Sequence, residues 1–238
     1  SGRGAAWDAA SRRRLRAQVR ASGLRLGGPN ALGIVNTDPQ IALDATFAAE
    51  PVPAGNVGML TQSNALGVVA LRRARRRGLG VSSFVAPGDK ADVSGNDLLS
   101  FWADDPRTRV IALYLESFGN PRHFARLAPV VAREKPIVVV ELAAAARERR
   151  RVESEADRLA GVDVAVDGLL HDAGVLRTQT LDEMLDVVAL LSSQPLPEGP
   201  GIGVVTNTGA PGGALAAACA TAGLSVARLS EGTVDALR

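Results

Sequence analysis

The stretch NVGMLTQSNALGVVALRRARRRG, Asn56 to Gly78, decides the fold class. It opens with VGML (Val57–Leu60), a short apolar run without polar alternation, which is typical of a strand covered on both faces. A corner of small polar residues follows, and then a helical pattern that ends at Gly78. The stretch therefore predicts one strand and one helix of a parallel α/β sheet.

The same alternation continues along the chain. The runs SSFVA, VIALYLE and IVVVEL each predict a buried strand, and NDLLSFWADD and PRHFARLAPVVARE predict the helices between them. After a strongly charged stretch, VDVAVDGLLHDAG predicts a helix, VLRTQ a strand and LDEMLDVVALLSSQ a further helix. Together these segments predict an α/β fold with a doubly wound parallel sheet.

Pro and Gly then interrupt the pattern at QPLPEGPG, which predicts a linker. Beyond it, IGVVTN, APGGALAAACATAG and LSVARL predict one βαβ unit, the start of a second α/β domain that is too short for a core of its own. The Arg-rich first 26 residues predict a remnant helix and strand of an upstream domain. We therefore expect three parts, 1–26, 27–195 and 196–238, and a homo-oligomer or exchanged segment that covers the last part.

Composition excludes several classes of protein. The 27 basic and 25 acidic residues leave a net charge of +2, and aromatic residues make up 3%, which argues against a nucleic-acid binder. No apolar run approaches the ~18 residues of a membrane span, and the start lacks a signal peptide, so we expect a cytoplasmic protein and no membrane contact. The single cysteine, Cys219, excludes an internal disulfide or a cysteine metal site; it is a buried small residue or a reactive thiol. The cluster RRARRR (Arg72–Arg77) is a solvated helix end or an anion-steering patch.

Two strand-to-helix corners are alike, LTQSNALG (Leu60–Gly67) and VTNTGAPGG (Val205–Gly213). The free N–H groups and partial positive charge of a helix N-terminus suit a phosphate. Tight turns also need small residues for steric reasons alone, so repetition of the corner is the stronger argument. The candidate phosphate-binding residues are Thr61, Gln62, Ser63, Asn64, Ala65, Asn207, Thr208, Gly209, Ala210 and Gly212, and Thr206 could add a hydroxyl donor.

A third motif, GGPNALG (Gly27–Gly33), follows a strand-like LRL. Pro and Asn favour a turn, and the flanking glycines leave room for a ligand. The same residues are also typical of a simple connection between domains.

These motifs, in order, resemble the ADP-forming (NDP-forming) acyl-CoA synthetases, relatives of the succinyl-CoA synthetase α subunit. GPNALGIVNTDP resembles the family's GPN(C/S)LG segment, NVGMLTQSNALG its SQSGALG turn, and SSFVAPGDKADVSGNDLL its GNKADV region. LYLESFGNPRHFARLA and VTNTGAPGG match as well, and the resemblance covers nearly the whole chain from about Arg25. ESFGNPR and NTDP are most similar to a bacterial branch that is often fused to a GNAT-type protein acetyltransferase.

The resemblance implies a flavodoxin-like domain in a larger protein, whose CoA-binding and ATP-grasp domains lie elsewhere in the parent chain. It implies CoA or acyl-CoA near Gly28, Pro29, Asn30 and Ala31, phosphate at the corners, ADP or ATP on the missing domains, and no metal in this part. The family converts acyl-CoA, phosphate and ADP to acid, CoA and ATP through a phosphohistidine. A GNAT domain is a further partner that the resemblance implies.

The family's histidine loop precedes a helix similar to VDVAVDGLLHDAGVLR, and ungapped matching puts Glu155 at the histidine position. Glu155 could form an acyl phosphate itself, act as a permanent anion that imitates phosphohistidine, or mark simple loss of the step. Glu116 is retained where the family has an acid that hydrogen-bonds the histidine, or else it is a plain strand-end carboxylate. We interpret His123 and His171 as solvated surface residues.

Asn64 and Ala31 also depart from the family pattern, at a glycine of SQSG and at the Cys or Ser of GPN(C/S)LG. We therefore expect a catalytically degenerate synthetase-like module that responds to acyl-CoA and phosphate, in an acetyltransferase or another larger protein. An active ADP-forming ligase and a purely structural assembly domain are the alternatives.

Overall fold

A computed structural model describes residues 9–141 and 166–237 of the chain. The chain divides into two compact units, Ser1–Gln194 and Pro195–Arg238. Among the described residues, no helix combines the length and the apolar composition that crossing a bilayer requires.

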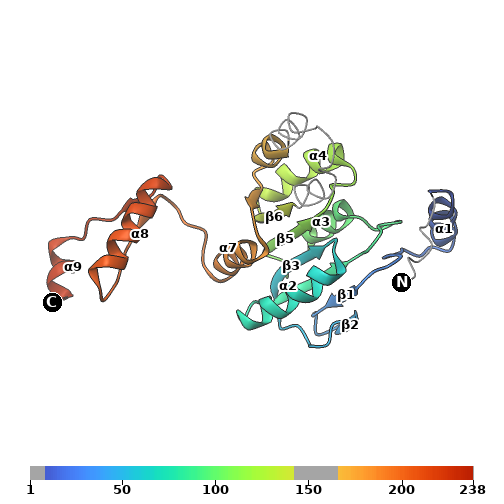
Figure 1. The fold of residues 1–238 in the computed structure, drawn as a ribbon, viewed down its shortest axis with the longest axis horizontal. Helices are drawn as coiled ribbons and strands as arrows, with labels where there is room; N and C mark the ends of the chain where they lie inside the picture. The colour runs from blue at the N-terminus through green and yellow to red at the C-terminus, as the bar shows by residue number, and fades with distance from the viewer. Residues whose placement is uncertain (1–8, 142–165, 238) are drawn as a thin grey trace, which may run out of the picture. The chain divides into compact units, whose positions relative to one another are not determined.

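The first unit is built on a seven-stranded sheet with the order β2-β1-β4-β3-β5-β6-β7 (Figure 1). The five strands from β3 onward are parallel to one another. Their bounds are β3 (Ala54–Thr61), β4 (Val81–Ala86), β5 (Val110–Leu115), β6 (Ile137–Glu141) and β7 (Leu176–Thr178). Within these five, the spatial order is second, first, third, fourth, fifth, which is the flavodoxin-like order.

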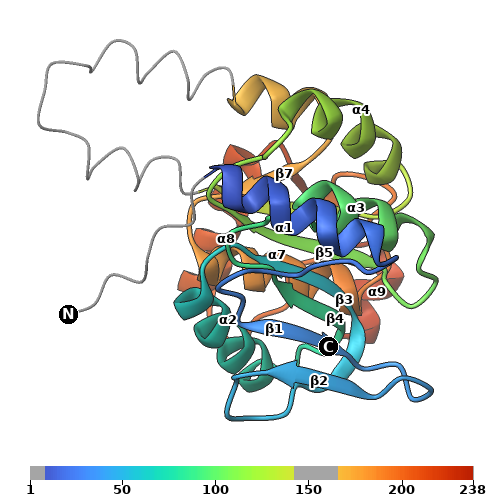
Figure 2. The same ribbon diagram turned by 90° about the vertical axis from the view of Figure 1, so that its right-hand side faces the viewer.

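Helices cover both faces of this sheet (Figures 1 and 2). α2 (Asn64–Arg76) and α7 (Leu181–Ser193) pack on one face, where Met59, Leu71 and Leu185 belong to one buried cluster. α3 (Gly95–Asp104), α4 (Pro121–Ala132) and the helical residues 166–172 cover the other face. A second cluster there contains Trp102 and Phe124. Burial on both faces explains why β4 and β5 are apolar without alternation, and the predicted doubly wound α/β fold is confirmed.

The sheet is not parallel throughout, which corrects the sequence-based expectation. β1 (Gly33–Asn36) pairs antiparallel with both β4 and β2 (Leu43–Thr46), and β2 forms the edge. Neither strand was predicted, because each has only four residues and β2 is largely exposed, so that neither carries a buried apolar run. The LRL segment, residues 24–26, which was expected to resemble a strand, is irregular.

The Arg-rich helix expected near the start is α1 (Ala9–Ala21). Its Arg20 and the following Arg25 both bind Asp92, which is fully buried, at 3.0 and 2.8 Å. Asp92 also accepts a hydrogen bond from the backbone N–H of Leu26. These contacts attach the end of α1 and the residues after it to the rest of the first unit. The origin of these residues in an upstream domain stays a prediction.

The second unit contains a two-stranded parallel sheet, β8 (Gly201–Ile202) and β9 (Ser225–Val226), with α8 (Gly209–Thr221) and α9 (Glu231–Ala236). The strands expected over 202–207 and 224–229 are therefore much shorter than predicted, and Val205 is 99% exposed. Cys219 is the one buried hydrophobic residue described in this unit, so little apolar burial is available to order longer strands. The prediction of a buried Cys219 is confirmed.

Candidate functional site at the carboxyl edge of the sheet

The carboxyl ends of β3 and β5 are neighbours in the sheet, although the chain reaches β4 between them. The strand order reverses at this point, because β4 lies on one side of β3 and β5 on the other. Ligands of open α/β sheets bind at such a switch point, outside the carboxyl ends of the strands. The corner after β3 and the acidic end of β5 therefore meet where the topology favours a site.

Gln62 connects the two strand ends. Its Nε2 donates to the carbonyl oxygen of Ser117 at 2.8 Å, and its Oε1 accepts from the backbone N–H groups of Glu116 and Ser117 at 2.8 and 2.9 Å. Its own backbone N–H donates to Tyr114 O at 3.1 Å. Gln62 is 9% exposed. The three side-chain bonds position the ends of the two strands and leave little of the amide for a ligand.

Helix α2 begins at Asn64, with Ser63 as the N-cap, whose side chain accepts from Leu66 N. Thr61 is fully buried beneath this turn, and its hydroxyl donates to Ser63 O at 3.3 Å. Gly67 is required here, because a Cβ atom would lie 2.8 Å from Thr61 Oγ1. Thr61 thus supports the turn, whereas Ser63 and Ala65 lie at its accessible end.

Asn64 joins this helix start to the turn at Gly28–Ala31. Its Nδ2 donates to Asn30 O at 2.7 Å, and its Oδ1 accepts from Leu32 N at 3.0 Å. The candidate CoA segment and the first candidate phosphate corner are therefore in direct contact. This contact is not expected from the family pattern, because the side chain that makes it replaces a family glycine.

A third loop, residues 87–93, completes the edge. Asp89 N donates to Pro29 O and Ala91 N to Gly28 O, at 2.9 and 3.0 Å. Gly88 lies so close that a Cβ atom there would be 2.3 Å from Asn30 O. The two loops form one continuous backbone-paired layer beside the start of α2.

Lys90 and Ser117 belong to this edge but were not among the predicted site residues. Lys90 lies in the third loop, and its Nζ donates to Ser117 Oγ at 2.9 Å. Burial lowers the pKa of Lys90, while the negative charge of Glu116 opposes that change. The sequence could have identified Lys90 as a site residue, because the GDKADV segment resembles a family motif and contains one of only two lysines in the chain.

Glu116 is exposed at the end of β5, and its backbone is held by Gln62. Two positions earlier, within β5, Tyr114 is 2% exposed. Burial, together with the charge of Glu116, raises the pKa of Tyr114 to about 12, so its hydroxyl stays protonated. The edge therefore offers a cation, a carboxylate and hydroxyl donors within one small region.

The second corner lies in the other unit. Thr206 Oγ1 donates to Thr208 O at 2.9 Å and accepts from Thr208 N at 3.2 Å, and Thr208 is the N-cap of α8. A Cβ atom on Gly212 would lie 2.8 Å from the Thr206 methyl group. The remaining candidates of this corner, Asn207, Gly209 and Ala210, are exposed. Glu155 lies outside the described residues.

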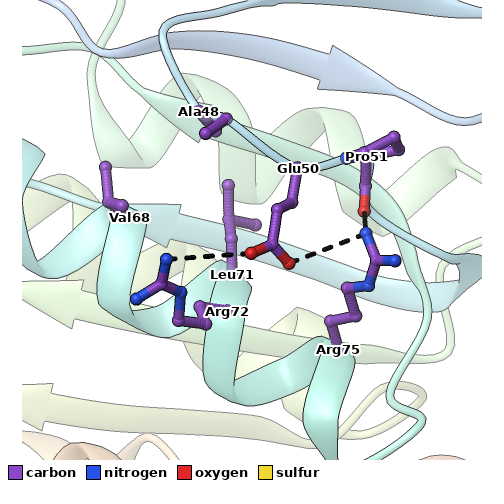
Figure 3. A pocket seen from close by; sticks show the side chains of 8 residues that line it. Ala48, Glu50, Pro51, Val68, Leu71, Arg72 and Arg75 are labelled. Atoms are coloured by element: carbon purple, nitrogen blue, oxygen red, sulfur yellow. Dashed lines mark hydrogen bonds and ion pairs between the residues drawn. The ribbon is translucent and has the colours of Figure 1, made fainter.

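Four of the five arginines of Arg72–Arg77 are bound by acidic partners of the same unit. Arg72 and Arg75 both lie 3.7 Å from Glu50, and Arg75 donates to Pro51 O at 3.1 Å, at the rim of a cavity of about 30 Å³ (Figure 3). Arg73 and Arg77 pair with Asp182. This use of their charge favours a structural helix end over an anion-steering patch.

His123 and His171 are exposed, as predicted. Within residues 9–141 and 166–237, no three His, Cys, Asp or Glu side chains cluster closely enough to suggest a metal site.

A family model described as the succinyl-CoA ligase-like flavodoxin domain matches residues 54–191. The match begins with β3 and ends within α7, and it includes the switch point. Among curated proteins, the chain is 35% identical over 216 residues to the acetate–CoA ligase [ADP-forming] II subunit alpha of Pyrococcus furiosus. The match covers 91% of this chain and 46% of that protein. It is 33% identical to the acetate–CoA ligase [ADP-forming] of Methanocaldococcus jannaschii, covering 90% and 30%.

Among solved structures, the dinucleotide-forming acetyl-coenzyme A synthetase 1 of Ca. Korarchaeum cryptofilum is similar in its apo form. The TM-score is 0.83 at 30% identity, over 95% of this chain and 49% of that one. The same enzyme in complex with phosphate and ADP gives a TM-score of 0.82 at 29% identity. The chain thus spans less than half the length of these relatives.

Proposed function

The chain belongs to the family of succinyl-CoA ligase-like flavodoxin domains and resembles ADP-forming acyl-CoA synthetases, and from this membership we propose that it is a catalytically degenerate, regulatory module of a longer protein. In this proposal it binds acyl-CoA and phosphate at the carboxyl edge of the sheet but no longer passes a phosphoryl group to ADP.

The proposal is supported by the hydrogen bonds that order the carboxyl ends of β3 and β5 and the start of α2. Gln62 holds the ends of β3 and β5 together, and Asn64 joins the start of α2 to the Gly28–Ala31 turn. An ordered edge of this kind is preorganised for an anion beside a helix N-terminus. The position that the resemblance assigns to the phosphohistidine carries Glu155 instead, and a carboxylate lacks the neutral imidazole nitrogen of that step. These observations therefore support binding of an anion, but they do not support transfer of a phosphoryl group through position 155.

An active ADP-forming ligase is the second candidate. Identity of 33–35% to two acetate–CoA ligases over about nine tenths of the chain favours it. It would require Glu155 to carry the phosphoryl group as an acyl phosphate, which hydroxylamine cleaves and which acid treatment distinguishes from phosphohistidine.

The test is ADP-dependent ATP formation from acetyl-CoA and phosphate by the intact protein, with direct measurement of acetyl-CoA and phosphate binding. We expect binding without turnover in the wild type, and a gain of turnover in Glu155→His. Glu153→His is the matched control, because it adds a histidine two positions away, and it should stay silent.

Turnover by the wild type would overturn the proposal in favour of the ligase. Absence of both binding and turnover would favour an assembly domain without a ligand. An acetyltransferase as the rest of the protein is proposed from the sequence resemblance alone.

A further inference from the structure

We propose that Lys90 and Glu116 form the selective part of an oxyanion site that takes hydrogenphosphate in preference to sulfate. This inference rests on the proposed function, in which phosphate occupies the carboxyl edge of the sheet. It concerns how the site distinguishes two tetrahedral anions of similar size.

Lys90 has a hydrogen-bonding capacity that the described protein does not fill. Its Nζ carries three donors. The structure describes a single hydrogen bond from it, to the neutral hydroxyl of Ser117 at 2.9 Å. A half-buried ammonium with one neutral partner remains a good ligand for an anion, because its charge is not compensated by a hydrogen-bonded carboxylate.

Lys135, the other lysine, shows what a structural lysine looks like in this fold. Its Nζ donates to Trp102 O and Asp105 O, both at 2.7 Å, and so satisfies the carbonyl groups at the end of α3. Lys90 makes no such contact with a helix end among the described residues. Lys135 therefore stabilises a helix end, whereas Lys90 keeps donors that a ligand can use.

The backbone at Lys90 is unfavourable for a lysine. Its φ is +51°, in the left-handed region that favours Gly and Asn. Neither of those residues would supply a positive charge. The loop therefore holds an ammonium at a place where its backbone alone would favour an uncharged residue, which points to a role for the charge.

Glu116 supplies the opposite chemistry beside it. Glu116 precedes Ser117, the hydrogen-bond partner of Lys90, in the sequence. Its negative charge favours the charged form of Lys90 and raises the pKa of Tyr114. An exposed carboxylate repels a fully ionised anion but accepts a hydrogen bond from a protonated one. Inorganic phosphate keeps a proton near neutral pH, whereas sulfate keeps none. A cation next to a carboxylate thus suits hydrogenphosphate.

Tyr114 adds an independent observation. It is 2% exposed, and its hydroxyl has no hydrogen-bond partner among the residues that the structure describes. A buried hydroxyl without a partner is destabilising, so a ligand or an ordered water that reached it would be favoured. Tyr114 lies in β5, two positions before Glu116, which follows the end of that strand.

The experiment titrates the intact protein with inorganic phosphate and, separately, with sulfate at constant ionic strength, by calorimetry at pH 7. The wild type should bind phosphate about tenfold or more tightly than sulfate, the effect of one charge-assisted hydrogen bond. Glu116→Gln should weaken phosphate, strengthen sulfate and bring the ratio close to one. Lys90→Asn should weaken both anions about tenfold or more.

Lys90→Asn tolerates the left-handed backbone, so thermal unfolding should show a folded protein. Arg126→Gln removes an exposed charge from α4 and controls for net charge; it should leave both affinities unchanged. If the wild type binds phosphate and sulfate equally, or if Glu116→Gln keeps the preference, this inference is wrong and the proposed function stands. If the wild type binds no phosphate, the proposed function fails as well.

Discussion

The side-chain amide of Gln62 and the backbone of Ser117 form a reciprocal pair, in which Nε2 donates to Ser117 O at 2.8 Å and Oε1 accepts from Ser117 N at 2.9 Å. The two residues are 55 positions apart and lie after neighbouring parallel strands. A side-chain amide is the group that can replace a missing strand-to-strand bond here, because it is donor and acceptor at once.

Gln62→Glu keeps the shape of the side chain and removes the donor. Ser117 O then loses its partner beside a new negative charge, so we expect a loss of about 1–3 kcal/mol in the free energy of unfolding, measured with urea. Gln194→Glu, at an exposed position, is the matched control and should change stability by less than about 0.5 kcal/mol. Equal effects of the two changes would contradict the role assigned to Gln62.

Asn64→Gly restores the glycine of the family pattern and removes the side-chain bonds to Asn30 O and Leu32 N. We expect a destabilisation of about 1–3 kcal/mol and faster hydrogen exchange at the backbone N–H of Leu32, which loses its acceptor. The same substitution at Asn207, an exposed residue of the other corner, should have a smaller effect. Unchanged exchange at Leu32 would show that Asn64 does not hold the turn.

Gly88→Ala tests the close approach of the two loops. The added Cβ atom would meet the carbonyl oxygens of Asn30 and Pro29 at 2.3 and 2.4 Å, in a backbone with φ of +61°. We expect a cost of about 2–4 kcal/mol, which combines the steric and conformational terms.

Gly119→Ala separates those two terms. Gly119 also has a positive φ, +67°, but a Cβ atom there would meet nothing within 4 Å. This variant should cost only about 1 kcal/mol. A cost at Gly119 as large as that at Gly88 would mean that backbone conformation alone explains both, and that the loops do not need to touch.

Asp92 makes stability depend on pH in the acid range. Although burial opposes it, bonds from Arg25, Leu26 and Arg20 hold the pKa of Asp92 at about 2, below the ordinary value of 3.8. Because the folded-state pKa is the lower one, the stabilisation is complete above the unfolded value and is lost as pH falls from about 5 toward 2.

Asp92→Asn should remove this contribution. We expect the stability difference between wild type and variant, about 1–3 kcal/mol at pH 7, to shrink steadily between pH 5 and pH 2. Urea unfolding at several pH values measures it. A difference that stayed constant over this range would show that the two arginines do not perturb Asp92.

The resemblance found in the sequence and the order of strands and helices agree with the structure over most of the first unit. Continuous apolar runs such as VIALYLE report burial on both faces, and the SNALG corner reports a helix start. The antiparallel pair β1–β2 was missed, since four residues with few buried side chains carry no such signal. The strands of the second unit were predicted too long, because their apolar runs are typical of buried strands. The described unit, however, gives these runs little apolar surface to pack against.

The sequence by itself determined the five parallel strands and the helices between them in the first unit, because strand and helix periodicity and helix capping depend on residues two to four positions apart. It also predicted a set of anion-binding side chains, which did not include Lys90. Only the tertiary structure decided that Asn64 reaches Asn30, that Gln62 reaches Ser117 and that Lys90 joins them. These contacts depend on the order of strands at the switch point, and that order follows from how apolar faces of the whole chain pack together rather than from any local pattern.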